Sequence, residues 1–250
     1  MLKFGIKLWT SNSATTFQHA AELIKSGKFD FVELFFNINE SLDYGKIDLV
    51  KSVPVDVHAT YLEGFHEFKI GPKEQKIWRE ILKLADFLRS EYVIVHPGLS
   101  FGWEHFEKNL SKIDDSRVLI ENMAGVNLFN QPTYGNTLEE LEDIKKRREI
   151  CFDFEKAVKS AIFHGKDYKL FITDCIKRLR PKYFHISGCD CDSPKDQHQN
   201  LWEAGFDLKW VKSLMSSLTK ENEIKLVFET PKVGDDLNND LKNLIFFKKL

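Results

Sequence analysis

Histidine and carboxylate side chains recur in this sequence at the ends of short apolar runs. The run EICFDF (149–154), for example, carries Asp153 near its end. Carboxylates packed together repel one another unless a positive charge neutralises them, while neutral imidazoles offer lone pairs to a cation. If these side chains meet in the folded protein, they therefore form a site suited to a divalent metal ion. The residues with this placement are His58, His96, Glu121, Asp153, His185 and Glu229.

The donor types narrow the choice of metal. Nitrogen and oxygen donors without thiolate suit Zn²⁺, Mn²⁺, Fe²⁺ or Co²⁺, whereas a site for Mg²⁺ alone normally uses fewer histidines. Cys189 and Cys191, in the stretch CDCD, could hold a soft metal, but two ligands without a second pair are a weak signal. A single strand-end His or Asp is more often a turn residue or a hydrogen-bonded polar group, so the prediction depends on all six being in register.

The apolar runs that carry these residues alternate with segments of helical period along the whole chain. Their near-continuous Val, Ile, Leu and Phe content is typical of parallel strands covered on both faces. Helical patterning is clearest in 14–26, 73–89, 138–147 and 207–218, and Asp207 is placed to cap the last of these. The eight predicted strands are 3–9, 29–36, 54–60, 91–98, 117–123, 149–154, 182–188 and 224–231.

Eight strand-plus-helix units in 250 residues predict a closed (β/α)₈ barrel, the TIM barrel, with an open doubly wound sheet as the alternative. No linker rich in Pro, Gly or Ser divides the chain, so we expect one domain over residues 1–250. In such a barrel the carboxyl ends of the strands gather on one face. The fold therefore predicts that the six strand-end residues meet around a common axis.

Composition and charge exclude several classes of protein. The chain is 42% hydrophobic and 30% charged, which is enough to bury a substantial core, so disorder is not expected. With 36 basic and 38 acidic residues, no global field attracts nucleic acid or an anionic membrane. No apolar run has the length of a spanning helix, and the start MLKFGIKLWTSNS lacks the apolar core of a signal peptide. We therefore expect a cytoplasmic protein with no membrane partner, and the sequence indicates no particular oligomeric state.

Eight short segments along the chain form a recognisable series. They are VEL (32–34), HATY (58–61), VHPG (95–98), ENMAG (121–125), CFD (151–153), FHIS (184–187), DQHQNLWEAGFD (196–207) and FETP (228–231). In order and spacing this series resembles the xylose-isomerase-like TIM barrels, the superfamily that contains endonuclease IV and many sugar isomerases and epimerases. The resemblance runs from the first predicted strand to the eighth and is specific at the level of the superfamily.

The resemblance implies a set of metal ligands. Sugar isomerases and epimerases of this superfamily typically hold one metal with two Glu, one Asp and one His. Their counterparts here are Glu121, Asp153, His185 and Glu229. Endonuclease IV holds three zinc ions, and for its additional ligands this sequence offers His58, His96, Asp196 and His198. The remaining place is taken by Lys156, which cannot bind zinc while protonated, so the resemblance does not extend to a complete third zinc site.

The resemblance further implies proton transfer, through an enediolate, on a small carbohydrate or carbohydrate-derived hydroxy-carbonyl compound. The metal, Zn²⁺ or Mn²⁺ with Mg²⁺ or Co²⁺ as alternatives, would polarise the carbonyl and lower the pKa of the adjacent C–H. Glu121 and Glu229 would remove and return the proton. Two bases on opposite faces suit epimerisation, whereas one base serving neighbouring carbons suits aldose–ketose isomerisation, and the sequence does not choose between them.

Four further residues are candidates for contacts with the substrate. His58 and His96 end predicted strands and would face the barrel mouth. Trp9 and Tyr61 follow strands and could stack on a sugar ring, although core packing or simple exposure explains such aromatic residues equally well.

Lys156 has two alternative interpretations, and Glu33 is assigned a structural one. Lys156 either points into the barrel mouth, where its ammonium would bind a phosphate, a carboxylate or a developing oxyanion, or it lies on a solvated helix. Glu33 lies within the second predicted strand and is expected to be a polar group of the barrel interior.

Two other functions remain open on the sequence. A zinc-dependent phosphodiesterase like endonuclease IV would act on abasic DNA, and nucleic acid is expected as a partner only in that case. The segments ENMAG and HATY favour it, while GIKLWTSNS and DQHQNLWEAG depart from the endonuclease motifs and their surroundings are not strongly basic. The third function is a barrel that has lost catalysis and only binds metal or ligand. We predict the sugar isomerase or epimerase.

Overall fold

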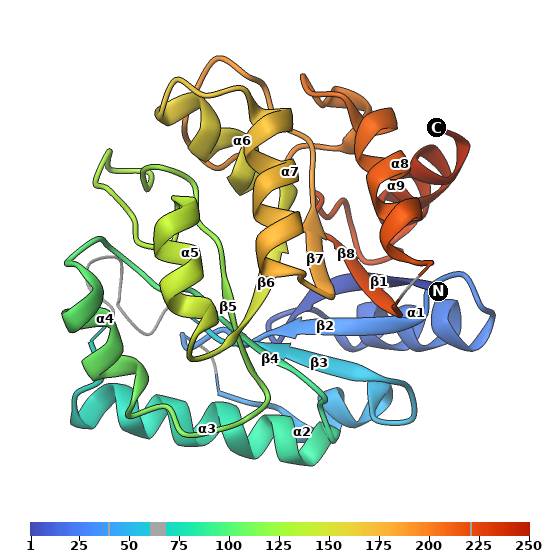
Figure 1. Cartoon of the computed structure of the whole chain (residues 1–250). Helices are drawn as coiled ribbons and strands as arrows, with labels where there is room; N and C mark the ends of the chain where they lie inside the picture. The colour runs from blue at the N-terminus through green and yellow to red at the C-terminus, as the bar shows by residue number, and fades with distance from the viewer. Residues whose placement is uncertain (40, 61–68, 221) are drawn as a thin grey trace.

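The computed structural model describes residues 1–39, 41–60, 69–220 and 222–250. Eight parallel strands pair in chain order and close into a barrel, because β1 pairs with β8 as well as with β2 (Figure 1). The strands are β1 Leu2–Trp9, β2 Phe31–Phe35, β3 Val55–His58, β4 Val93–Val95, β5 Val118–Glu121, β6 Glu149–Asp153, β7 Tyr183–Ile186 and β8 Ile224–Phe228. The predicted TIM barrel is confirmed.

Helices surround the strands on the outside of the barrel (Figure 1). The four segments with the clearest helical period form α1 Ala14–Lys25, α3 Pro72–Leu88, α5 Leu138–Lys145 and α8 Leu208–Leu218. Asp207 caps α8 as predicted, since its side chain accepts a hydrogen bond of 3.0 Å from the backbone N–H of Trp210. The other helical elements are α2 Tyr44–Ile47, α4 Trp103–Leu110, α6 Phe154–Phe163, α7 Tyr168–Leu179, α9 Asn238–Lys249 and the 3₁₀ turns η1 Asp48–Val50 and η2 Leu201–Glu203.

Seven of the eight observed strands are shorter than the predicted ones, mostly at their carboxyl ends, while β1 begins one residue earlier than predicted. β4 was predicted over 91–98 and spans Val93–Val95, and β8 was predicted over 224–231 and spans Ile224–Phe228. His96 and Glu229 therefore follow their strands by one residue instead of ending them. The apolar run continues past the pairing because these residues still line the barrel mouth, where side chains stay buried after the ladder has ended.

Alternate residues of each strand point into the barrel, as the pleat of a strand requires. In β1, Ile6 and Leu8 belong to the main core between the strands and the helices, while Gly5 and Lys7 face inward. Gly5 leaves room for the ring of Phe31, since a Cβ at this position would lie 2.4 Å from a ring carbon. The interior is filled by a second apolar cluster, and its members are Phe31, Ile94, Leu119, Cys151, Tyr183 and Val227.

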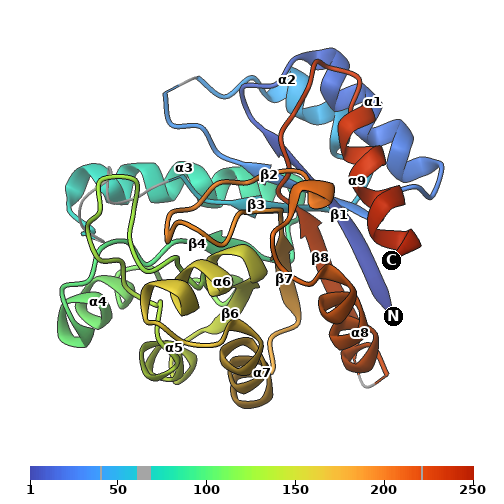
Figure 2. The same ribbon diagram turned by 90° about the horizontal axis from the view of Figure 1, so that it is seen from above.

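The two chain termini lie on the same side of the molecule in both views (Figures 1 and 2). Within the described residues, no helix combines the length and the apolar character that crossing a membrane would require.

Candidate metal centre in the barrel mouth

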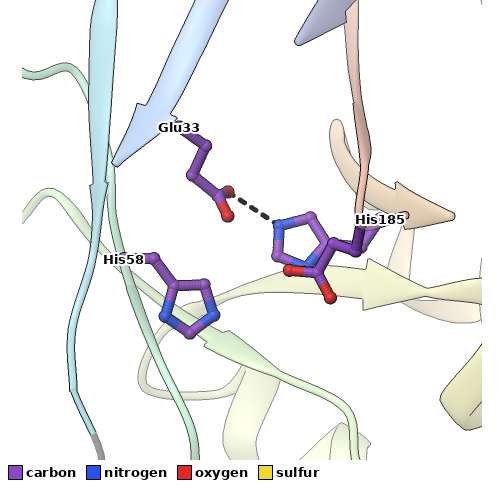
Figure 3. Close-up of side chains that lie close together, drawn as sticks. Glu33, His58 and His185 are labelled. Atoms are coloured by element: carbon purple, nitrogen blue, oxygen red, sulfur yellow. Dashed lines mark hydrogen bonds and ion pairs between the residues drawn. The ribbon is translucent and has the colours of Figure 1, made fainter. Parts of the chain in front are cut away.

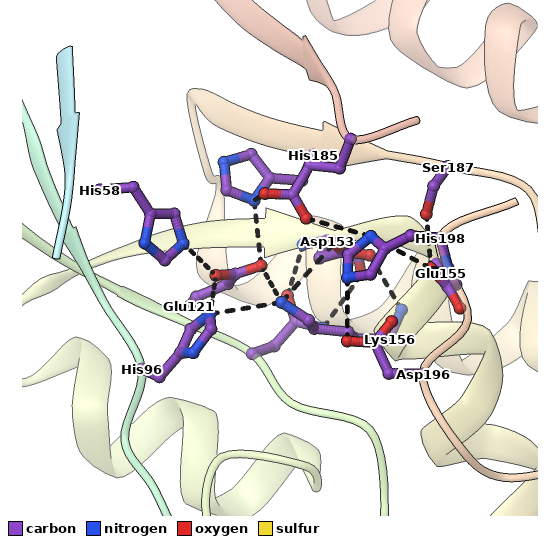
Figure 4. Close-up of polar contacts among 12 residues, drawn as sticks. His58, His96, Glu121, Asp153, Glu155, Lys156, His185, Ser187, Asp196 and His198 are labelled. Carbon is purple, nitrogen blue, oxygen red and sulfur yellow. Dashed lines mark hydrogen bonds and ion pairs between the residues drawn. The ribbon is translucent and has the colours of Figure 1, made fainter. Parts of the chain in front are cut away.

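The six residues predicted at strand ends converge inside the barrel mouth, and all of them except Glu229 are labelled in Figure 4. All six are buried, with at most 6% of any of them exposed. Their donor atoms form overlapping groups within which every ligand atom lies within 4.8 Å of the others. One group is His58, His96 and Glu121, and another is Glu121, Asp153, His185 and Glu229.

Glu121, the last residue of β5, is shared by both groups and lies at the centre of the site (Figure 4). Its Oε2 lies 3.1 Å from Nε2 of His58 and 2.7 Å from Nε2 of His96. Its Oε1 lies 3.0 Å from Nδ1 of His185 and accepts a hydrogen bond of 2.5 Å from Nζ of Lys156. Both oxygens of this carboxylate thus face nitrogen atoms that come from four different segments of the chain.

Asp153 caps a helix with one carboxylate oxygen and leaves the other available to the site. Its Oδ1 caps α6 by accepting a hydrogen bond of 2.9 Å from the backbone N–H of Lys156. Asn122 fixes the backbone of Asp153, donating to its carbonyl at 3.0 Å and accepting from its N–H at 2.6 Å. Oδ2 is buried and has no hydrogen-bond partner among the described residues. A buried carboxylate oxygen without a hydrogen bond is costly, so this atom is the clearest donor for a cation.

His185 is oriented by a carboxylate behind it (Figure 3). Its Nε2 lies 2.7 Å from Oε2 of Glu33, and because a carboxylate only accepts, Nε2 carries the hydrogen. Nδ1 then faces Glu121 Oε1 at 3.0 Å and Glu229 Oε1 at 3.1 Å. Carboxylates that hold the far nitrogen of a metal-binding histidine are a regular feature of metal sites. Glu33 was expected only as an interior polar group, and the structure places it in direct support of the cluster.

Lys7 is a charged residue of the site that the sequence analysis did not identify. It lies inside β1, is buried, and its Nζ lies 2.8 Å from Oε1 of Glu33 and also pairs with Oε1 of Glu229. These two carboxylates raise the pKa of Lys7 against the opposing effect of burial, so its ammonium stays charged. Its only signal in the sequence is a lysine within the apolar run GIKLW.

Lys156 points into the mouth and is 2% exposed, so the interpretation as a solvated helix residue is wrong. Besides its bond to Glu121, its Nζ lies 3.4 Å from Nε2 of His96 and 3.9 Å from Oδ2 of Asp153. Burial would lower its pKa, but Glu121 and Asp153 raise it well above the ordinary value. The ammonium therefore acts as a fixed positive charge within the cluster.

A third donor group lies at the rim of the mouth and consists of Glu155, Asp196 and His198. His198 Nε2 lies 3.1 Å from Oδ2 of Asp196, and His198 Nδ1 lies 3.5 Å from Oε2 of Glu229. Glu155, the second residue of α6, is fully buried and accepts hydrogen bonds from the backbone N–H groups of Gln197 at 2.6 Å and His198 at 3.1 Å. Glu155 was not predicted, because the segment EKAVKS has the composition of a surface helix.

The electrostatics of the cluster keep two of its imidazoles, those of His58 and His96, neutral and available as donors. Burial and the charge of Lys156 lower the pKa of His96 to about 4, and burial followed by the charge of Lys7 lowers that of His58. Burial would also lower the pKa of His185, but the surrounding carboxylates raise it well above its ordinary value. Burial raises the pKa of Asp153 to about 6.

The residues present fit a divalent metal ion. Four carboxylates converge here (Glu33, Glu121, Asp153 and Glu229), while the positive charge that contacts them within the described cluster comes from three groups, Lys7, Lys156 and protonated His185. Such an excess of buried negative charge is unfavourable without a further cation. The mixed imidazole and carboxylate donors suit Zn²⁺ or Mn²⁺, and the described parts of the chain bring no cysteine into any of these donor groups.

A cavity of about 410 Å³ opens above the cluster. Trp9 and Phe35 form part of its apolar wall, which is compatible with the predicted contact between Trp9 and a substrate. Tyr61, the other predicted aromatic contact, lies outside the described residues. The polar lining of this cavity is Lys7, His58, His96, Lys156, His198, Glu229 and Thr230.

Comparisons with known proteins agree with this architecture. No protein-family model matches the sequence, and no curated protein is significantly similar to it. Among solved structures, endonuclease IV from Thermus thermophilus is similar with a TM-score of 0.70 and 18% identity, over 99% of this chain and 98% of that one. The 3-keto-D-glucoside 4-epimerase from E. coli is similar with a TM-score of 0.65 and 14% identity over the full length of both chains. A D-psicose 3-epimerase is similar with a TM-score of 0.59 and 12% identity, over 96% of this chain and 89% of that one.

These structural neighbours are xylose-isomerase-like TIM barrels, and this chain shares their fold. Identities below 20% establish the fold and not the reaction. The class defined by fold and site is thus a (β/α)₈ barrel, similar in fold to these proteins, with a buried cluster of histidine and carboxylate groups at its mouth.

Proposed function

We propose that the protein is a divalent-metal-dependent isomerase or epimerase that acts on a sugar or sugar-derived hydroxy-carbonyl compound. One observation carries the proposal. The ligand atoms of Glu121, Asp153, His185 and Glu229, at the carboxyl ends of four consecutive strands, lie within 4.8 Å of one another, and Glu229 lines an open cavity. The similarity to two epimerases of keto sugars supports the choice of substrate class.

In this proposal those four residues hold the metal, with Zn²⁺ or Mn²⁺ the preferred ions and Mg²⁺ or Co²⁺ acceptable. Glu33 holds the hydrogen of His185 on Nε2 and directs Nδ1 toward Glu121 and Glu229, where a bound metal ion would replace the proton on Nδ1. Oδ2 of Asp153, which has no hydrogen bond within the described structure, is the second clear donor.

A bound divalent metal supplies Lewis-acid polarisation of the substrate carbonyl, which acidifies the neighbouring C–H. Glu121 and Glu229 are the proposed pair that removes and returns this proton. Burial opposes their ionisation, but Lys156 and His185 hold the pKa of Glu121 well below its ordinary value, and His185 and Lys7 do the same for Glu229. Both groups are therefore ionised, as proton acceptors must be.

Lys156 is proposed to stabilise the negative charge that develops on a substrate oxygen. Its ammonium is fixed by Glu121, lines the cavity, and is fully charged, so it needs no reorganisation when that charge appears. His58 and His96, which line the same cavity, are proposed to hydrogen-bond substrate hydroxyl groups, and Trp9 is proposed to pack against the sugar ring.

A zinc-dependent phosphodiesterase acting on abasic DNA is the second candidate. Its specific support is the additional donor group His58, His96 and Glu121, together with Asp196 and His198 at the rim. The ammonium of Lys156 counts against it, because a positive charge 3.4 Å from Nε2 of His96 repels a second divalent ion bound there.

The deciding experiment combines elemental analysis of the purified protein with proton-exchange NMR on a panel of ketoses and aldoses in D₂O. We expect about one tightly held metal per chain and entry of solvent deuterium at the carbon next to a carbonyl. Two or three zinc ions with cleavage of an abasic duplex would establish the second candidate instead. No deuterium uptake by any sugar, whichever metal is supplied, would contradict the proton-transfer mechanism.

A further inference from the structure

A second cavity adjoins the metal centre and has a different character. It encloses about 230 Å³ between the segment that follows β5 and the segment that follows β7. Its apolar wall consists of Leu99, Met123, Ala124, Val126, Leu128 and Phe129. Its polar side is formed by Asp196, Gln197 and His198.

The segment after β5 is held rigidly although its tip is apolar. Val126 pairs with Pro132 in an antiparallel bridge, which makes the segment a hairpin. At its tip the side-chain oxygen of Asn127 accepts hydrogen bonds from the backbone N–H groups of Phe129 at 2.9 Å and Gln131 at 3.0 Å. Leu128 and Phe129 are nevertheless 64% and 65% exposed. Two large and mostly exposed apolar side chains on an ordered turn, beside a cavity, are a recognised sign of a binding surface.

The polar side of the cavity is also anchored by hydrogen bonds. Buried Lys159 donates from Nζ to the carbonyl of Ser193 at 2.9 Å and to Oε1 of Gln197 at 2.8 Å. Lys195 joins this segment to the hairpin by donating to the carbonyl of Leu128 at 3.2 Å. The cavity is therefore preformed, because hydrogen bonds anchor both of its walls and join them to each other.

His198 connects this cavity with the metal centre. It lines both cavities, and its Nδ1 lies 3.5 Å from Oε2 of Glu229. Because His198 lines both cavities and Glu229 lines the first, a molecule bound at Glu229 would reach the apolar wall by extending past His198. This continuity favours an extension of the substrate over a separate protein partner as the occupant.

We propose that this cavity is an apolar subsite, and that the natural substrate is a hydroxy-carbonyl sugar bearing an apolar substituent about the size of an aromatic ring. The volume supports this size, since a cavity of about 150 Å³ lined by aliphatic and aromatic side chains accepts benzene. The inference rests on the proposed function, because it takes the reacting part of the substrate to lie at Glu229. A free pentose or hexose leaves the apolar wall in contact with water.

The test measures binding to the metal-loaded protein by isothermal titration calorimetry, with phenyl β-D-glucopyranoside and methyl β-D-glucopyranoside as probes. Benzyl alcohol, followed by saturation-transfer NMR, serves as a third probe that does not require the metal centre. We expect the phenyl glycoside to bind about tenfold more tightly than the methyl glycoside, since burial of the ring removes apolar surface from water. Saturation should appear on the aromatic protons of both aryl compounds.

The variant Leu128→Ala/Phe129→Ala should lose this preference and retain its fold, because both side chains are largely exposed. Leu170→Ala is the matched control, since Leu170 is 70% exposed on α7 and lines neither of the two cavities, and it should keep the full preference.

Equal affinity of the two glycosides for the wild-type protein, or no binding of either aryl probe, would overturn the subsite. So would an aryl preference that survives in the double variant. Failure of the proposed function has a different signature, because the aryl preference would then be present while no sugar exchanges its protons. Binding of an abasic duplex that is lost in the double variant, with no binding of glycosides, would overturn the subsite and assign the apolar wall to nucleic acid.

Discussion

The barrel encloses two groups of buried charge. In one group the carboxylate oxygens all have partners, whereas in the other the donor atoms converge as in a metal site. Near the amino ends of the strands, Lys225 pairs with Asp56 at 2.9 Å and with Glu91 at 2.7 Å. Oδ1 of Asp56 also accepts a hydrogen bond of 3.1 Å from the backbone N–H of Tyr92. Both oxygens of Asp56 thus have partners, and the group reaches solvent through Glu91, whose side chain is 62% exposed.

The cluster at the mouth shows the opposite pattern. Its carboxylates outnumber its lysines, its imidazoles converge on the carboxylates, and Oδ2 of Asp153 has no hydrogen bond within the described structure. The aromatic ring of Tyr183 lies between the two groups, with its hydroxyl donating to Glu33 at 2.9 Å and Lys225 located 6.0 Å from its ring centre. Burial of charge is common to both ends, so convergence of donor atoms is the feature that indicates a metal site.

The largest effect is expected from Glu121→Gln. This substitution removes the carboxylate shared by both donor groups, so metal binding should be lost and the rate of proton exchange should fall roughly a thousandfold or more. Metal content by elemental analysis and deuterium uptake by NMR measure the two effects, and circular dichroism controls for folding. A variant that keeps its metal and its exchange rate would show that the cluster is only structural.

Lys225→Met tests the other end of the barrel. It leaves Asp56 buried without its partner, which should cost about 3–5 kcal/mol of unfolding free energy. The loss of unfolding free energy should be larger at pH 8 than at pH 5, because Asp56 is protonated at the lower pH and no longer carries an unpaired buried charge. Urea denaturation of the metal-free protein measures the change, and metal content should be unaffected. Loss of metal binding in this variant would remove the distinction between the two groups.

Asp56 also makes a predictable contribution to the pH dependence of stability. Burial raises its pKa from the ordinary value of 3.8 to about 6, with Lys225 opposing the shift. The folded state therefore binds this proton more tightly than the unfolded state does. Its contribution to stability is complete below about pH 4 and is lost as the pH rises through about 6, a change of about 3 kcal/mol.

Asp56→Asn should remove this part of the pH dependence. The measurement is urea denaturation of metal-free wild-type and variant protein between pH 4 and pH 7. The difference in unfolding free energy between the two proteins should shift within that interval and stay constant above it. A constant difference throughout would mean that Asp56 titrates at its ordinary pKa.

The smallest effect is expected from Glu33→Gln. The amide cannot hold the hydrogen of His185 on Nε2 as firmly as a carboxylate, so metal affinity should fall about 10–100-fold while the fold is retained. Competition with a chelator measures the affinity. Glu91→Gln is the matched change at the other end of the barrel and should leave the affinity unchanged. An equal loss in both variants would indicate a general effect of charge instead of orientation.

Most of the fold could be predicted from the sequence, because parallel strands and their helices leave a strong hydrophobic pattern. The convergence of His58, Glu121 and Asp153 could also be predicted, since a closed barrel brings all strand ends together. Strand ends were less predictable, because side chains at the mouth remain buried beyond the last paired residue, as at Glu229.

Lys7 and Glu155 could not be predicted for a different reason. A lysine within a strand and a glutamate at the start of a helix are ordinary surface residues unless their partners are known. Their partners, Glu229 and the backbone of Gln197 and His198, are 222, 42 and 43 residues away along the chain. Burial of such groups depends on tertiary contacts that no local pattern encodes.

The double role of Asp153 links the chemistry of the mouth to the regular structure of the barrel. One oxygen begins a helix and the other faces the centre, and the ammonium of Lys156 extends from the same helical turn. Acid and ammonium are thereby held at a spacing set by helix geometry, which loop rearrangements do not alter. Insertions and deletions in the segments around the rim could consequently redirect this scaffold toward new molecules during evolution without disturbing its reactive core.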